Sequence, residues 1–353
     1  MAPTVLFIGG TGIISWSCVR EAIARGWKVS VLNRGRSALR PVPEQAELIR
    51  CDVRDHVAAQ AALAGRRFDV VADFLSFTPD QLAATTGLVK GRTGHYIAIS
   101  TAAAYKRGAP LPITESTPLV NPWWQYSRDK IACEEYLTHL IRTEGFPGTI
   151  VRPAHTYDAG LLPCLGGWTD IARMRAGIPV VVQGDGTSLW VLTHASDFAA
   201  CFVALFGDGR AIGDTFHIAG DEVLTWNGIY SELARAAGVD APQLVHVTSE
   251  AIAEELPELG PGLIGDRTHS VIFDSSKVRS IATGFAQKVR FSVGGTPDHG
   301  VPRRAPRAPG GQPRLGRGVR SPGGASRGEL GASVGMAPRG GARAGSEATR
   351  AHP

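Results

Sequence analysis

Long apolar runs are missing from this 353-residue sequence. A membrane-spanning helix needs about 20 consecutive apolar residues, so we expect no transmembrane segment. The N-terminus also lacks a basic region ahead of its short apolar run, and a secretory signal peptide would need one. We therefore expect a cytoplasmic protein without a membrane partner.

Cysteines are few and scattered. No two of the five stand in a Cys-x-x-Cys pair, and no histidine lies near one at the spacing of metal ligands. We expect reduced thiols, no disulfide bond and no metal site. The five are Cys18, Cys51, Cys133, Cys164 and Cys201.

Hydrophobic periodicity is absent from the last part of the chain. Residues 295–353 hold ten arginines and three acidic side chains, a balance of +7 in a chain whose net charge is +5. We predict that 293–353 is a disordered Gly/Pro/Arg-rich tail, because it cannot bury enough surface to fold. An RNA-binding segment and a solvated linker are two interpretations. We favour out-of-frame translation of GC-rich DNA, since recognisable pattern stops near Phe291, and we do not expect a nucleic-acid partner.

The N-terminal part has the pattern of a strand, a glycine turn and a helix. Apolar residues 5–8 are followed by Gly9-Gly10-Thr11-Gly12, with Ser15 in place of a third glycine, and a helix-like segment. Such a turn lets the backbone approach a pyrophosphate, which sits on the helix N-terminus. A second apolar segment at 27–32 completes a βαβ unit. The residues expected to bind a dinucleotide here are Gly9, Thr11, Gly12, Ile13 and Ile14.

The residues after the second strand separate NAD from NADP. A carboxylate there would bind the ribose 2′-hydroxyl, whereas an arginine would accommodate a 2′-phosphate. The chain has Asn33, Arg34 and Arg36 and no carboxylate, so we expect NADP or NAD, with NADP favoured. The alternative is that both arginines are solvated loop residues. Asp52, followed by Val53, ends a third apolar segment and is expected near the adenine.

Strand-like runs at 69–72, 95–100 and 149–152 alternate with helix-length stretches. This alternation predicts an α/β fold of the Rossmann type, with a doubly wound parallel sheet that binds ligands at its carboxyl edge. We place the NAD(P)-binding domain at 1–155. A smaller C-terminal substrate region, interleaved with the last Rossmann elements, is expected at 156–292.

The catalytic candidates follow the strand that ends in Ser100 and Thr101. Tyr126 and Lys130 are four residues apart, so they share one face of a helix. A lysine ammonium beside a phenol lowers the phenol pKa from about 10, so the tyrosine can exchange a proton with a substrate oxygen. Thr101 would hydrogen-bond the same oxygen. The alternative is a chance pair on the surface.

With these motifs the chain resembles the short-chain dehydrogenase/reductase superfamily, in its extended or atypical branch of NAD(P)-dependent epimerases, dehydratases and reductases. The resemblance spans roughly residues 4–290 and includes 100–105, 151–153 and 194–199. Residues 218–227 are similar to an atypical subgroup that includes chloroplast RNA-binding relatives.

The resemblance implies roles for individual residues. Tyr126 would be the acid/base, and Lys130 would hold the nicotinamide ribose and tune Tyr126. Ser100, Pro153 and His155 would complete the cofactor site. The sequence does not give the oligomeric state, although paired helices around Tyr126 commonly form homodimers in this family.

Departures from the family pattern reduce the number of reactions and substrates to be considered. Dehydratases carry an Asp-Glu pair directly after the catalytic threonine, where this chain has Ala102 and Ala103. Dehydration is therefore not expected. Nucleotide-sugar epimerases usually have a diphosphate-binding arginine where this chain has Trp190, which weakens the case for a nucleotide-diphosphate sugar.

Aromatic residues near the expected site are candidates for substrate contact. Trp123 and Trp124 precede Tyr126 and are suited to stack on a sugar ring, while Tyr157 and Trp190 follow later in the chain. The sequence predicts an NAD(P)-dependent epimerase of a sugar or sugar-like metabolite that acts by reversible hydride transfer. An NADP(H)-dependent ketoreductase with the same residues and a non-catalytic nucleotide- or RNA-binding protein are the alternatives.

Overall fold

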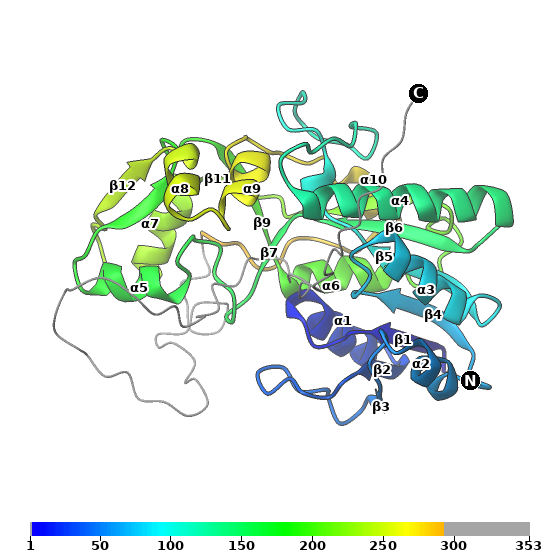
Figure 1. Cartoon of the computed structure of the whole chain (residues 1–353). Helices are drawn as coiled ribbons and strands as arrows, with labels where there is room; N and C mark the ends of the chain where they lie inside the picture. Colours follow the sequence, from blue (N-terminus) through cyan, green and yellow to red (C-terminus); the bar gives the residue numbers. More distant parts are fainter. Residues whose placement is uncertain (1, 293–353) are drawn as a thin grey trace, which may run out of the picture.

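Residues 2–292 are described by the structure, which is a computed structural model. They form two lobes, seen side by side in Figure 1. The larger lobe contains the N-terminus and the central sheet, and the smaller lobe is built from later segments of the chain. The predicted tail at 293–353 lies outside the described residues.

The central sheet has seven strands in the order β10-β6-β5-β4-β1-β2-β3. All of its strand pairs are parallel. From β3 to β6 this order is that of dinucleotide-binding sheets, whose ligands lie at the carboxyl edge. The strands are β1 (Thr4–Ile8), β2 (Lys28–Asn33), β3 (Glu47–Arg50), β4 (Phe68–Asp73), β5 (Thr93–Ile99), β6 (Gly148–Pro153) and β10 (Thr215–Ile218).

Helices cover both faces of this sheet, which confirms the predicted doubly wound α/β fold. Helices α1 (Ile13–Ala24) and α6 (Ala195–Ala204) share an apolar core with one face. Helices α2 (His56–Ala62), α3 (Pro79–Val89) and α4 (Gln125–Glu144) share another core with the opposite face. The apolar runs of the strands are buried because both faces are covered.

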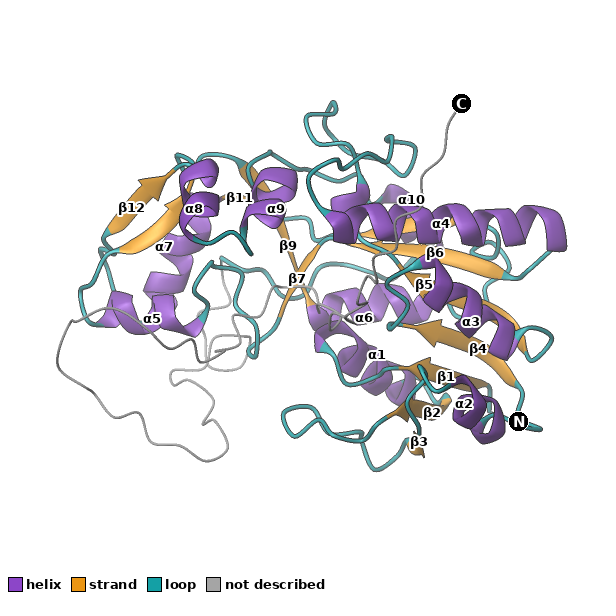
Figure 2. Cartoon of the chain, in the orientation of Figure 1, coloured by secondary structure: helices purple, strands orange, loops and turns teal. Residues whose placement is uncertain are grey.

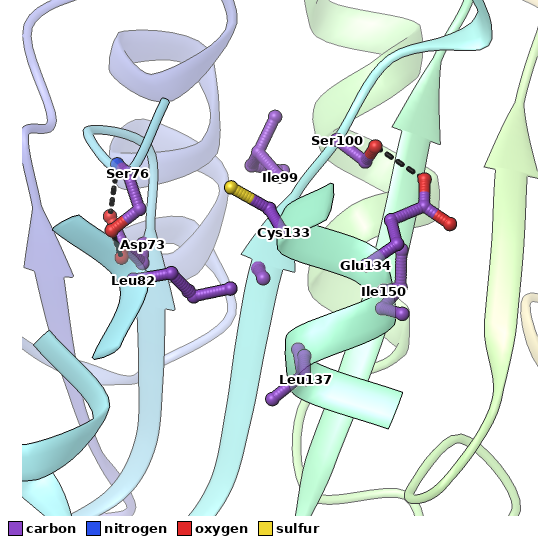
Figure 3. Close-up of a pocket in the computed structure, with 10 residues that line it drawn as sticks. Asp73, Ser76, Leu82, Ile99, Ser100, Cys133, Glu134, Leu137 and Ile150 are labelled. Carbon is purple, nitrogen blue, oxygen red and sulfur yellow. Dashed lines mark hydrogen bonds between the residues drawn. The ribbon is translucent and has the colours of Figure 1, made fainter. Parts of the chain in front are cut away.

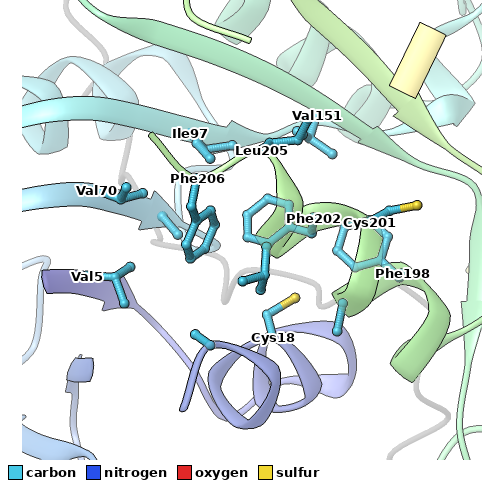
Figure 4. Packing of buried hydrophobic residues seen from close by; sticks show 14 of the residues in the cluster. Val5, Cys18, Val70, Ile97, Val151, Phe198, Cys201, Phe202, Leu205 and Phe206 are labelled. Atoms are coloured by element: carbon cyan, nitrogen blue, oxygen red, sulfur yellow. The ribbon is translucent and has the colours of Figure 1, made fainter. Parts of the chain in front are cut away.

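The core beneath α1 and α6 is rich in phenylalanine. Figure 4 shows Phe198, Phe202 and Phe206 packed in one cluster with Val5 and Val70 of the sheet. The ring centroids of Phe198 and Phe202 are 5.5 Å apart, and those of Phe202 and Phe206 are 5.3 Å apart. Buried aromatic rings contribute much of the stability of such a core. This packing holds α6 on the central sheet.

The smaller lobe contains two short sheets, of order β11-β9-β7 and β12-β8 (Figure 2). Trp190 and Trp226 lie in its core, with ring centroids 5.1 Å apart. Its elements are β7 (His155–Tyr157), α5 (Trp168–Arg175), β8 (Val180–Gln183), β9 (Leu189–His194), β11 (Val223–Thr225), α7 (Trp226–Ala236), β12 (Leu244–Val247), α8 (Ser249–Glu255), α9 (Gly260–Gly262) and the π-helical turn η2 (Leu263–Arg267).

The chain passes between the lobes more than once. After β9 it returns to the central sheet as α6 and β10, then enters the smaller lobe again at β11. Two further short elements are η1 (Ala102–Ala104), which follows β5, and α10 (Ser276–Ile281), which lies against β10. The domain limits that we place at 1–155 and 156–292 stay predictions.

Local capping explains several helix boundaries. The Asp55 carboxylate accepts from the Ala58 amide at 3.0 Å at the start of α2. The Thr225 hydroxyl accepts from the Gly228 amide at 3.0 Å at the start of α7. Such caps satisfy amides that have no partner within the helix. Gly145, with a φ of 61°, ends α4 in the left-handed region that favours glycine.

Over residues 2–292, no helix is both long enough and apolar enough to serve as a membrane span. All five cysteines are buried, and none forms a disulfide. In the same part of the chain, no three His, Cys, Asp or Glu side chains gather in a way that could hold a metal ion.

Candidate active site

The glycine turn after β1 is tight. Gly9 and Gly10 have φ values of 113° and 81°, a region that L-residues with side chains rarely adopt. A Cβ on Gly10 would lie 2.7 Å from Cγ1 of Val31. The turn therefore requires glycine, and its backbone can approach a ligand closely.

The N-terminus of α1 fits a pyrophosphate. The Gly12 amide donates to the Ser15 hydroxyl at 2.8 Å, so Ser15 closes the turn in place of the third glycine. Ile13 and Ile14 begin the helix, and amides of a first turn have no acceptor within the helix. The residues present thus suit the diphosphate of a dinucleotide.

The expected adenosine end lies beside β2 and β3. The Asn33 amide donates to the Gly9 carbonyl at 2.8 Å, and its oxygen accepts from the Gly35 amide at 2.7 Å, so Asn33 shapes the loop. Arg34 and Arg36 are exposed. Arg50, which the sequence did not indicate, also lies against this loop. Its Cζ is 3.2 Å from the position that a Cβ on Gly35 would take.

These three arginines have no acidic partner. Within residues 2–292, no ion pair or side-chain hydrogen bond involves Arg34, Arg36 or Arg50. Asp52 is exposed beside them, with its carboxylate accepting from the Arg54 amide at 3.0 Å. Val53 is a core residue, so only its backbone is available to a cofactor.

Tyr126 lies in the first turn of α4 and reaches the loop after β5. Its phenol lies near the side chain of Thr101, and their interaction lowers the phenol pKa. Thr101 also accepts from the Ala103 amide at 3.1 Å, which fixes its hydroxyl at the N-terminus of η1. Tyr126 is partly exposed, yet the protein packed around the phenol raises its pKa.

Lys130 follows one helical turn later and is 2% exposed. Its Nζ donates to the backbone carbonyls of Ser76 at 2.6 Å and Ile99 at 2.8 Å. Burial lowers the pKa of Lys130. The expected lowering of the Tyr126 pKa is not found, because burial raises this pKa and the charge of Asp266 raises it further, while only the interaction with Thr101 lowers it.

The contacts of Lys130 were not foreseen from sequence. Ser76 lies just after β4, and its hydroxyl and amide both donate to the Asp73 carboxylate. Tyr96 also donates to Asp73, at 2.6 Å. Asp73 ends β4 at the carboxyl edge, which is the signal that could have identified this group.

A small cavity lies under this part of the site, between α4 and the sheet (Figure 3). Its volume is about 10 Å³, which suits one water molecule. Asp73, Ser76, Ser100, Cys133 and Glu134 are among the residues that line it. The cavity is too small for a substrate.

Ser100 is held by a buried charge pair. Its hydroxyl donates to the Glu134 carboxylate, as Figure 3 shows. Arg152 Nη2 lies 2.5 Å from Glu134 Oε2, and both side chains are almost fully buried. In this structure the Ser100 hydroxyl therefore fixes the end of β5, and its expected contact with the cofactor stays a prediction.

Pro153 and His155 lie at the junction of the lobes. His155 Nδ1 accepts from the Trp190 indole at 2.9 Å, and its Nε2 has no hydrogen-bond partner in residues 2–292. Burial lowers the pKa of His155 well below its ordinary value. Trp190 and Tyr157 are 2% and 3% exposed, so both contribute mainly to the core of the smaller lobe.

The two tryptophans before α4 differ in environment. Trp124 packs beside Tyr126, with ring centroids 5.0 Å apart, and lies close to Gly262 of the smaller lobe. Trp123 is 48% exposed, and its ring centroid is 6.3 Å from that of His269. The structure therefore brings Trp124 to Tyr126 and leaves Trp123 further towards solvent.

Curated proteins with sequence similarity to the chain include a stem-loop binding protein and a reductase. The chloroplast stem-loop binding protein of 41 kDa b of Arabidopsis thaliana is 25% identical over 254 residues, which cover 69% of this chain and 65% of that protein. The chain thus spans just under two thirds of that relative. The 2′-dehydrokanamycin reductase of Streptomyces kanamyceticus is 29% identical over 263 residues, which cover 72% of each chain.

The fold has close counterparts among solved structures. The UDP-glucose 4-epimerase of Thermus thermophilus, in complex with NAD, superposes with a TM-score of 0.66 at 21% identity, over 84% of this chain and 98% of that one. The model of the NAD dependent epimerase/dehydratase family matches residues 5–219. Together with the glycine turn and the Thr101, Tyr126 and Lys130 arrangement, this match places the chain in the NAD dependent epimerase/dehydratase family.

Proposed function

We propose that this protein catalyses NAD(P)-dependent hydride transfer at a secondary alcohol of a sugar or sugar-like metabolite. The observation that carries the proposal is that Tyr126, at the start of α4, lies beside Thr101 at the start of η1, one helical turn from buried Lys130 and at the carboxyl edge of the sheet. Side chains at this edge meet both the cofactor and its substrate in folds of this kind.

Tyr126 exchanges the proton of the reacting hydroxyl. Thr101 is fixed by the Ala103 amide, so it orients the substrate oxygen towards the phenol. A lysine ammonium has three donors, and Lys130 commits two of them to backbone carbonyls. The third is left to bind a ribose hydroxyl of the cofactor. The chemistry supplied by bound NAD(P) is reversible hydride transfer, with inversion of the carbon when the hydride returns to the opposite face.

We favour an epimerase over a reductase. The family includes both kinds of reaction, and relatives of the chain include a UDP-glucose 4-epimerase of Lactobacillus helveticus and the reductase of Streptomyces kanamyceticus. A ketoreductase that uses NADP(H) is the second candidate. It is supported by Arg34, Arg36 and Arg50, which leave three guanidinium groups available to a 2′-phosphate.

The test is a comparison of the wild type with Tyr126→Phe. Hexoses and UDP-hexoses are incubated with the protein and NAD(P), and cofactor reduction and the formation of epimers are measured. We expect Tyr126→Phe to lower the rate by ~100- to 10,000-fold, because it removes the acid/base group. Binding of NADPH should be unchanged, which shows that the variant is folded. Turnover that is the same in both proteins would reject the proposal.

A further inference from the structure

Arg107 is a buried cation with unused hydrogen-bond donors. Its side chain is 2% exposed. Nη2 donates to the Ala102 carbonyl at 3.2 Å and to the Asp266 carboxylate. Nε and Nη1 are buried and have no hydrogen-bond partner in residues 2–292. A buried donor without a partner is costly, so these two N–H groups need an acceptor that comes from elsewhere.

Asp266 meets Arg107 from the smaller lobe. It lies in η2, and its side chain is 17% exposed. One carboxylate oxygen accepts from Arg107, and the other makes no hydrogen bond within residues 2–292. The pair therefore offers a free acceptor beside two free donors.

The backbone around the pair is held in place by Asn121. Its Nδ2 donates to the Ala103 carbonyl and to the Gly265 carbonyl, each at 2.9 Å. A Cβ on Gly265 would lie 2.8 Å from Asn121 Oδ1, so the close approach depends on glycine. Asn121 thus links η1 to η2, and the positions of Arg107 and Asp266 relative to one another are fixed before a ligand binds.

The pair lies next to the catalytic residues. Ala102, which accepts from Arg107, directly follows Thr101. The Asn121 bridge between η1 and η2 also holds Asp266 beside the loop that begins at Thr101. A ligand held by Arg107 and Asp266 would therefore place its neighbouring carbon at Tyr126.

Charge and geometry identify the class of ligand. The ion pair has no net charge, so it does not attract a second anion strongly. In the planar guanidinium, Nε–H and Nη1–H lie on different sides of Nη2 and cannot grasp one carboxylate together. They suit two separate oxygens, and hydroxyl groups can also donate to the free oxygen of Asp266.

We propose that Arg107 and Asp266 hold the hydroxyl groups adjacent to the reacting carbon of an uncharged sugar ring. This inference rests on the proposed function and names the part of the substrate that the site recognises. Trp124, whose ring packs beside Tyr126, would cover the apolar face of the same ring.

The experiment measures binding of sugars whose ring is uncharged to protein loaded with NADP⁺. D-glucose, D-galactose and their UDP derivatives are tested by saturation-transfer NMR and titration, and each deoxy analogue of the best-bound sugar is then compared. We expect Arg107→Met to weaken binding of the parent sugar by ~10- to 100-fold, because hydrogen bonds from a charged donor are lost. One deoxy analogue should bind the wild type as weakly as the parent sugar binds Arg107→Met. The affinity for this analogue should not fall further in Arg107→Met.

Matched variants separate recognition from folding. Lys106→Met changes the exposed neighbour of Arg107 and should bind sugars as the wild type does. Arg107→Lys keeps a positive charge for Asp266 but lacks the second donor group. It should therefore also bind the parent sugar no more tightly than the deoxy analogue. NADPH binding and thermal unfolding report whether each variant is folded.

Three results would overturn this proposal. The first is sugar binding that is unchanged in both Arg107→Met and Arg107→Lys, and the second is the absence of sugar binding by the wild type. The third is an acidic sugar, tested as glucuronate and UDP-glucuronate, that binds through Arg107 at least tenfold tighter than glucose or UDP-glucose does. Failure of the proposed function looks different, since Tyr126→Phe would then retain turnover whatever the Arg107 variants do.

Discussion

The guanidinium of Arg40 is paired with the carboxylate of Asp158, with Nη2 2.6 Å from Oδ2 and Nε 3.1 Å from the same oxygen. Arg40 lies in the loop after β2, and Asp158 directly follows β7 of the smaller lobe. The indole of Trp16 donates to the Pro41 carbonyl at 2.9 Å, which ties the same loop to α1. The loop therefore connects the two lobes beside the helix end that suits the pyrophosphate.

We predict that this pair slows release of the cofactor. The two side chains are only 13% and 16% exposed, so the pair is screened less than a surface ion pair. Asp158→Asn should raise the dissociation rate of NADPH by about tenfold, corresponding to about 1.4 kcal/mol. Stopped-flow fluorescence measures the rate. Glu21→Gln removes an exposed helical pair with Arg25 and serves as the control.

Gly160 provides an independent test of the same contact. A Cβ at this position would lie 2.5 Å from Arg40 Nη2, so the end of the arginine would have to move away from Asp158. Gly160→Ala should therefore speed NADPH release as Asp158→Asn does, with little change in thermal stability. Release rates that match the wild type in both variants would show that the loop does not retain the cofactor.

The arginines around Gly35 should select NADP over NAD. A triple variant should bind NADPH ~10-fold or more weakly, because charge-assisted contacts to a 2′-phosphate are lost. It combines Arg34→Gln, Arg36→Gln and Arg50→Gln. Binding of NADH, which lacks that phosphate, should stay within about twofold and is the internal control. Equal losses for the two nucleotides in calorimetric titrations would contradict the prediction.

The direction of the Tyr126 pKa shift predicts how the reaction depends on pH. Oxidation of an alcohol needs the phenolate as base, and burial raises the pKa of this phenol above its ordinary value of about 10. The rate of NADP⁺ reduction should therefore rise through neutral and alkaline pH without reaching a plateau near pH 8. Tyr126→Phe should remove the rise. A plateau below pH 8 in wild-type initial rates would show that another group sets the profile.

Much of this arrangement is readable in the sequence. The apolar runs place the strands, the glycines place the turn, and the spacing of Tyr126 and Lys130 places both on α4. Long-range contacts are not readable in this way, because Arg107 meets Asp266 only through the packing of two lobes. The direction of the Tyr126 pKa shift is not readable for a related reason. The burial that raises this pKa comes from tertiary packing, which the spacing to Lys130 does not show.

His95 should make the fold sensitive to acid. It is buried in β5, with Nε2 2.8 Å from the Thr149 hydroxyl, and burial lowers its pKa to about 4. The unfolded chain binds a proton near pH 6.5, so stability is lost as pH falls from about 6.5 towards 4. The free energy of unfolding in urea should drop by about 2 kcal/mol between pH 7 and pH 5 from this residue alone. In His95→Gln the drop should be smaller by that amount, and an equal drop would exclude His95 as its cause.

The most direct test of the central claim is the nucleotide content of the protein. Freshly purified protein is denatured, and any released nucleotide is identified by mass spectrometry and quantified against protein. The account predicts NAD(P) at a near-equimolar ratio, because an epimerase keeps its cofactor through the catalytic cycle. Protein that releases no nucleotide, and that also fails to bind added NADH or NADPH, would contradict it.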